Sequence, residues 1–123
     1  CAAALAVMDI MKRDDYAGKA RHIGEVVMKR YKELQEKYPV IGDVRGLGAM
    51  IGIELVKDKE TKEPATELTA KLIQNAIQKG LLLENCGTAG NVVRFLAPLT
   101  MTDEQMEKGL EIFEASLKEA MEA

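Results

Sequence analysis

Two long stretches of the chain place apolar residues three or four positions apart, with charged residues between them. This spacing predicts helices that bury one face. The first is expected over residues 16–38, before Pro39, and its predicted buried residues are Ile23, Val27, Tyr31, Leu34 and Tyr38. The second follows Thr102 and Gln105, which have the spacing of a capping box. Its predicted buried residues are Met106, Leu110, Phe113, Leu117 and Met121.

Residues 2–13 are expected to form a separate helix, because Asp14 and Asp15 offer a break and a cap for the helix that follows. Apolar side chains from Ala2 to Met8 cover every face of this first helix. A helix that is apolar all round is expected to be buried. We therefore predict that residues 1–13 are a linker helix from a larger protein whose missing large domain covers it. The alternative is that the helix packs on the core of this chain.

The middle of the chain reads as short strands around one helix. Residues 49–56 are rich in branched side chains and predict a strand, and residues 40–48 read as a turn-rich lead into it. Residues 81–85 and 92–96 are expected to pair as a hairpin around residues 86–91.

A further helix is predicted from Pro64, in its first turn, to Lys79, with Gly80 as its stop. Its predicted buried residues are Leu68, Leu72, Ile73, Ala76 and Ile77. The order of elements indicates the α+β class, with a small, mainly antiparallel sheet and helices packed on one face. Residues 1–123 are expected to form a single domain, since 47% of them are hydrophobic and the chain is long enough to bury a core.

Charge and composition exclude several partners. The 17 basic residues are interleaved with 20 acidic ones, for a net charge of -3, so no positive surface for nucleic acid is expected. The apolar runs fall far short of the roughly 18–20 residues that cross a bilayer, so no membrane partner is expected. The two cysteines, Cys1 and Cys86, stand far apart in sequence, which favours a reducing compartment. No role is assigned to Cys86.

Residue counts also exclude common catalytic sites. A Ser-His-acid triad would depend on Ser116 and His22 alone, both on predicted helices, and a zinc site lacks ligands. Every lysine falls in a polar stretch, so none is expected to act as a Schiff-base or general-base lysine. Gly46, Gly48 and Gly52 resemble a dinucleotide fingerprint, but they lead into a strand instead of a helix. Residues 86–91 are interpreted as a hairpin turn in preference to an anion-binding loop.

Arg94 is the single residue that most suggests a binding site. Period two puts it on the same strand face as Val92 and Leu96. A guanidinium there reaches water, pairs with a carboxylate of the protein, or receives a carboxylate from a ligand. Taken without family information, the residues favour an internal pair or a solvated face over a ligand. Arg45, in a predicted turn, is expected to be structural.

Three segments carry a family resemblance. Residues 44–54, 79–83 and 91–100 closely resemble the C-terminal part of class III pyridoxal 5'-phosphate (PLP) aminotransferases, and the likeness extends over nearly all of the chain. Family members that act on 4-aminobutyrate look most similar. The resemblance implies the C-terminal small domain of a fold-type I PLP enzyme, with residues 1–13 as the helix from the large domain.

The resemblance also implies an activity. The full-length enzyme is expected to transfer the amino group of 4-aminobutyrate, or of a related ω-amino acid, to 2-oxoglutarate, with PLP as cofactor. Its Schiff-base lysine and other cofactor-binding groups lie upstream, so this chain is expected to hold no catalytic, cofactor-binding or metal-binding residue. Arg94 alone matches a family site residue, the arginine that receives a substrate carboxylate.

Three further expectations follow from the resemblance. The chain alone is predicted to be inactive and to bind no PLP. The full-length protein is predicted to be a cytoplasmic homodimer whose small-molecule partners are amino and oxo acids. The alternative is a freestanding, non-catalytic α+β module that binds a ligand or a protein.

Overall fold

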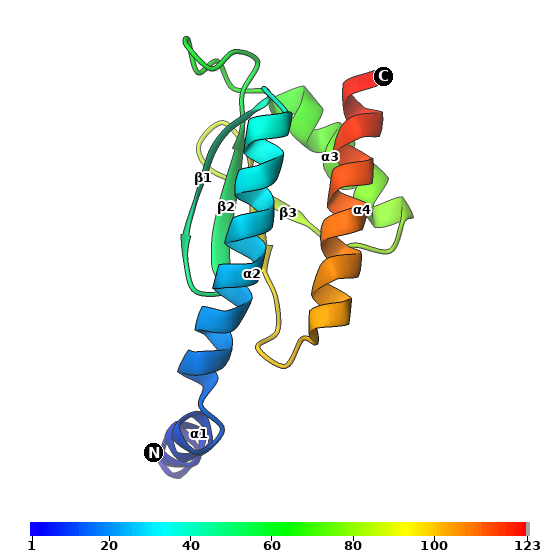
Figure 1. The fold of residues 1–123 in the computed structure, drawn as a ribbon. Coiled ribbons are helices and arrows are strands. Elements are labelled where there is room, and N and C mark those ends of the chain that lie inside the picture. Colours follow the sequence, from blue (N-terminus) through cyan, green and yellow to red (C-terminus); the bar gives the residue numbers. More distant parts are fainter. Residues whose placement is uncertain (123) are drawn as a thin grey trace.

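The computed structural model describes residues 1–122 and contains four helices and four strands (Figure 1). In chain order these are α1 (Ala2–Arg13), α2 (Tyr16–Lys37), β1 (Ile41–Leu47), β2 (Met50–Leu55), α3 (Thr66–Gln78), β3 (Glu84–Cys86), β4 (Val92–Leu96) and α4 (Asp103–Glu122). The strands form one sheet in the order β1-β2-β4-β3, and each neighbouring pair is antiparallel. The predicted α+β class is confirmed.

The helix ends follow the capping residues of the sequence. The Asp15 carboxylate accepts a hydrogen bond from the backbone N–H of Gly18 at 3.0 Å and caps α2. At the start of α4 the backbone N–H of Thr102 donates to the Gln105 side chain at 3.0 Å, and the Gln105 N–H donates to the Thr102 hydroxyl at 3.2 Å. The predicted capping box is therefore confirmed. Gly80 follows α3 with a φ of +86°, a left-handed conformation that favours glycine at a helix end.

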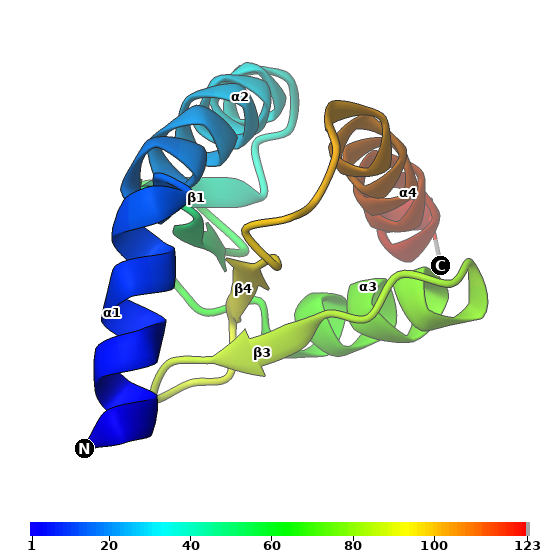
Figure 2. The same cartoon turned by 90° about the horizontal axis from the view of Figure 1, so that it is seen from below.

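Three helices cover one face of the sheet. Figure 2 shows α2, α3 and α4 on the same side of the strands. All five residues predicted to form the apolar stripe of α2, from Ile23 to Tyr38, are buried. Tyr31, at the centre of the stripe, packs edge-on against Phe113 of α4 and Phe95 of β4, at centroid distances of 4.9 and 6.3 Å. These three rings join the two helices to the sheet, so the core lies between the sheet and the helices.

The prediction that residues 40–48 are a turn-rich lead is wrong, because residues 41–47 form β1. This strand pairs with β2 through a tight turn at Gly48 and Ala49. The sequence did not indicate this strand because it contains glycines, which usually mark a turn. Gly46 is needed here because a side chain at this position would bring its Cβ to 2.3 Å from the backbone oxygen of Met50.

Several predicted boundaries also differ. Pro64 is not in the first turn of a helix, because it bridges to Val56 while α3 begins at Thr66. Residues 81–83 are outside β3, which has only three residues. Ile77 and Met121 were predicted to be buried, but 49% and 43% of their surface is exposed. Ile77 follows the buried Ala76 on α3 and turns toward solvent, and Met121 lies in the last turn of α4, past the core.

Helix α1 stands apart from the rest of the molecule (Figure 1). None of its residues, Ala2 to Arg13, is buried, and Leu5 and Met8 are 63% and 64% exposed. The alternative that this helix packs on the core of the chain is therefore wrong. That a missing large domain covers it stays a prediction.

Gly24 allows α2 to lie directly on the turn between β1 and β2. A Cβ at Gly24 would lie 2.5 Å from the backbone oxygen of Gly48. We expect Gly24→Ala to lower the free energy of unfolding by about 1–2 kcal/mol, because the overpacking cost exceeds the gain in helix propensity. Urea denaturation of the chain measures this. Gly109→Ala in α4 is the matched control: its Cβ would meet only Leu81, at 3.7 Å, so this variant should be unchanged or more stable.

Candidate carboxylate-binding site

The face of the sheet turned away from the helices carries the candidate site. Along β2 the residues Ile51, Ile53 and Leu55 are buried, so the alternating residues Met50 and Gly52 lie on the other face. Strand pairing extends this face sideways in two rows, because directly opposed residues share a face. The first row is Leu47, Met50 and Leu96. The second row is Arg45, Gly52, Arg94 and Glu84. We call these two rows the open face.

Arg94 is the central cation of the open face. It lies in β4 with its side chain 40% exposed, and its Nη2 donates to a carboxylate oxygen of Glu84 on β3. On its other side it faces Gly52, which has no side chain. The flank of Arg94 toward β2 is therefore not occupied by a neighbouring side chain on that strand.

A hollow of about 560 Å³ adjoins Arg94. It is lined by residues 80–84, 94–98 and Met101. The wall is mostly apolar, with Arg94 and Glu84 as its charged groups. A planar guanidinium at the edge of an apolar hollow can hold a carboxylate by two parallel hydrogen bonds while the rest of the molecule lies along the apolar wall.

Arg45, in the same row, is already paired with two carboxylates of the protein. Its Nη1 donates to Asp43 at 2.8 Å and to Glu54 at 2.6 Å. Both hydrogen bonds raise the pKa of Arg45 above its usual value, and the one to Asp43 contributes most. The residue lies in strand β1 and not in a turn as predicted, but it is held by the protein's own carboxylates, as a structural arginine would be.

The other candidate groups lie in separate parts of the structure. His22 contacts Asp103 at 2.7 Å, whereas Ser116 is fully buried within α4. Gly46, Gly48 and Gly52 lie in and between two strands. Of residues 86–91, Cys86 ends β3 and residues 87–91 join β3 to β4. Both cysteines are free. Among residues 1–122 no group of three or more Cys, His, Asp or Glu is placed to hold a metal ion.

The lysines of this chain do not fit the covalent attachment of the cofactor that the family resemblance implies. A lysine that binds PLP covalently must be unprotonated, which burial or neighbouring cations favour. Every lysine of the chain is exposed. We therefore assign no step of PLP chemistry to these residues.

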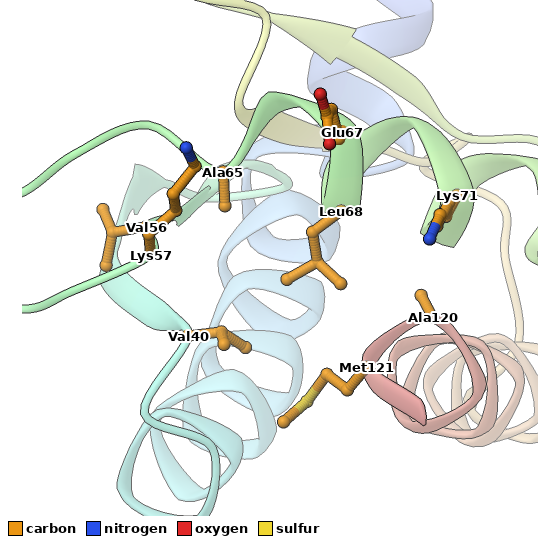
Figure 3. A pocket seen from close by; sticks show the side chains of 9 residues that line it. All are labelled: Val40, Val56, Lys57, Ala65, Glu67, Leu68, Lys71, Ala120 and Met121. Carbon is orange, nitrogen blue, oxygen red and sulfur yellow. The ribbon is translucent and has the colours of Figure 1, made fainter. Parts of the chain in front are cut away.

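A second hollow, of about 400 Å³, lies on the helical side of the sheet. Figure 3 shows Val40, Leu68 and Met121 converging on its centre, with Lys57 and Lys71 among the residues around them. Lys57 is paired with Glu63 at 2.6 Å. Because the sheet separates this hollow from Arg94, it is not part of the carboxylate site.

Glu84 is the site residue that the sequence did not reveal. The predicted turn over residues 86–91 would pair Asn85 with Val92 and leave Glu84 opposite Val93. In the structure Cys86 pairs with Val92, so Glu84 lies opposite Arg94. A one-residue change of register decides the partner of every side chain in a hairpin.

None of the helices in residues 1–122 is both long enough and apolar enough to span a membrane.

Comparisons with known proteins identify the family of this chain. The chain is 47% identical over 112 residues to 5-aminovalerate aminotransferase DavT of Pseudomonas aeruginosa, covering 91% of this chain and 26% of that protein. It is 43% identical over 120 residues to 4-aminobutyrate aminotransferase GabT of Escherichia coli, covering 98% of this chain and 28% of that protein.

A solved structure agrees with these relatives. An amine transaminase from an uncultivated Pseudomonas species, in its PLP-bound form, matches with a TM-score of 0.84 and 34% identity, over 98% of this chain and 27% of that chain. The chain thus spans about a quarter of the length of the relatives it matches. Residues 1–117 match the family described as Aminotransferase class-III, and the chain belongs to this family.

Proposed function

We propose that the chain is the C-terminal small domain of a PLP-dependent aminotransferase that moves the amino group of an ω-amino acid to 2-oxoglutarate. The donor is 4-aminobutyrate or a close homologue such as 5-aminovalerate, the substrates named for two similar relatives. Arg94 receives a carboxylate of 2-oxoglutarate. The observation that carries this role is the position of Arg94 on the open face, beside an apolar hollow and with a glycine on one flank.

In this proposal the chain binds and orients the acceptor, and residues outside the chain hold PLP. Two parallel hydrogen bonds from the Arg94 guanidinium fix both the position and the rotation of the acceptor carboxylate. The apolar residues Phe95 and Leu96 line the hollow beside it and limit access of water to the bound chain of the acid. The small domain alone is proposed to be inactive, since its lysines are all exposed.

The proposal extends to the whole protein. We propose a cytoplasmic homodimer, and the two unpaired cysteines are compatible with a reducing compartment. The alternative of a freestanding binding module finds less support, because the similar relatives are enzymes. The gene separates the two: a reading frame that continues upstream for roughly two further domains of 100–200 residues supports the aminotransferase, whereas a start codon just before Cys1 supports the module.

The role of Arg94 is tested by Arg94→Lys in the full-length enzyme. We expect the KM for 2-oxoglutarate to rise about tenfold, because the lysine keeps the charge but loses one charge-assisted hydrogen bond, worth about 1.5 kcal/mol. Steady-state kinetics with 4-aminobutyrate as donor measure this. Arg45→Lys is the matched control on the same face and should leave the KM unchanged. An Arg94→Lys enzyme with wild-type kinetics would refute the assignment.

A further inference from the structure

The hollow between the start of α3 and the end of α4 takes no part in the proposed reaction, because the sheet separates it from Arg94. Its volume is about 400 Å³, within the roughly 300–1,000 Å³ of small-molecule sites. Figure 3 shows it opening between the first turns of α3, the last turn of α4 and the segment before β1. We call it the helical-side hollow.

The walls of the helical-side hollow are apolar. They consist of Val40, Val56, Ala65, Leu68, Ala120 and Met121. Ala65 and Ala120 are buried, and their short side chains leave space that larger residues would fill. Met121 is 43% exposed and points into the centre together with Leu68 (Figure 3). An apolar chain placed there would remove both side chains from water, which is favourable.

Three charged residues line the rim, and the first, Lys57, already has a partner in the protein. Its Nζ donates to Glu63 at 2.6 Å. That hydrogen bond, with a smaller contribution from the charge of Glu67, raises the pKa of Lys57 above its ordinary value. The Glu67 carboxylate itself is directed away from Leu68 and Met121 in Figure 3. The third charged residue, Lys71, is therefore the one available to a ligand.

Lys71 is placed to bind the head group of a molecule whose chain fills the hollow. It lies three residues after Leu68, so the two side chains share a face of α3. In Figure 3 its amine points from α3 toward Ala120. None of the ion pairs among residues 1–122 involves Lys71. An ammonium group has three N–H donors and no acceptor, so it selects an anion.

We propose that the helical-side hollow binds an aliphatic monocarboxylate of medium length, with its carboxylate on Lys71 and its chain along Leu68 and Met121. A second carboxylate on the chain would be pressed against apolar walls without a partner, which is costly. The site therefore excludes dicarboxylates such as 2-oxoglutarate. This inference does not depend on the role of Arg94, since the two sites lie on opposite sides of the sheet.

The test is a titration of the full-length enzyme with octanoate, followed by NMR of ¹³C-labelled methionine methyl groups. The Met121 methyl signal, assigned with Met121→Leu, should shift and saturate with a Kd of about 1 mM. Met101 lines the hollow beside Arg94, so its signal reports any binding of octanoate there. Titration with 2-oxoglutarate should leave the Met121 signal unchanged.

Two lysine variants test the head group. Lys71→Gln should weaken octanoate binding at Met121 about two- to fivefold, the effect of losing one exposed ion pair. Lys108→Gln is the matched control: it removes the same charge from an exposed position in the first half of α4 and should leave the Kd unchanged. If the Met121 signal does not saturate, the hollow is not a binding site. If it saturates equally in the Lys71→Gln enzyme, or if 2-oxoglutarate binds there as well, the assignment of a monocarboxylate is wrong.

Discussion

Phe113→Ala is expected to lower the free energy of unfolding of the chain by about 3–5 kcal/mol, the cost of truncating a fully buried aromatic side chain. Phe113 is 0% exposed and packs edge-on against Tyr31 at 4.9 Å. Its removal leaves a cavity between α4 and α2 and takes away the ring contact as well. Such a loss is a large share of the roughly 5–15 kcal/mol that stabilises a domain.

Urea denaturation followed by far-ultraviolet circular dichroism measures this loss. Phe113→Leu keeps most of the volume and should cost about 1–2 kcal/mol. Met121→Ala, on the same helix but 43% exposed, should cost less than about 1 kcal/mol. If Phe113→Ala costs no more than Met121→Ala, the ring is not at the centre of the core as described.

The second large effect is expected at Glu114, whose carboxylate joins α4 to the end of α2. One of its oxygens accepts hydrogen bonds from Lys37 at 2.6 Å and from the Tyr38 hydroxyl at 2.8 Å, and the other accepts from Arg30 at 3.0 Å. The Glu114 side chain is only 13% exposed. We expect Glu114→Gln to cost about 2–3 kcal/mol at pH 7, since it removes the charge shared by three donors.

The pH dependence of this effect has a definite sign. The hydrogen bond from Lys37, helped by that from Tyr38, outweighs burial and lowers the pKa of Glu114 below its ordinary value of 4.5. A carboxyl group whose pKa is lowered on folding stabilises the protein above its unfolded pKa, and this contribution is lost as the pH falls through the folded value. The gap in unfolding free energy between wild type and Glu114→Gln should thus be constant above about pH 5.5 and narrow below about pH 4.5.

Denaturation curves at several pH values test this pattern. Glu111→Gln is the control, because Glu111 is exposed on the same helix. It should leave the unfolding free energy within about 0.5 kcal/mol of wild type at each pH. A Glu114→Gln variant whose deficit persists unchanged at pH 3 would show that the deficit does not come from the carboxylate charge.

The sequence predicted the helices well because their signals are local. The stripe from Ile23 to Tyr38 repeats over about four turns, and the capping box at Thr102 marks a helix start by side-chain chemistry within four residues. Both were confirmed. The errors at Ile77 and Met121 arose where the stripe reaches the edge of the core: periodicity gives the direction of a side chain on a helix, but not how far the neighbouring layer extends.

Strand β1 shows why the sequence predicted the sheet less well than the helices. Its glycines read as turn residues, yet Gly46 is glycine because the backbone of Met50 lies against it. That approach exists only once β1 and β2 have paired. The family motifs identified Arg94 as the residue to examine, but the partner of Arg94 was hidden in the same way, since it depends on register.

For this protein, the sequence alone determined the fold class and the helical stripes, because spacing and capping chemistry are properties of neighbouring residues. It also singled out Arg94, whose role stays a prediction. Only the tertiary structure decided that β1 is a strand, that α1 lies outside the core, and that Glu84 holds Arg94 while Asp43 and Glu54 hold Arg45. The physical reason is that each of these outcomes depends on a contact between segments distant in the chain, and a single residue of register changes it.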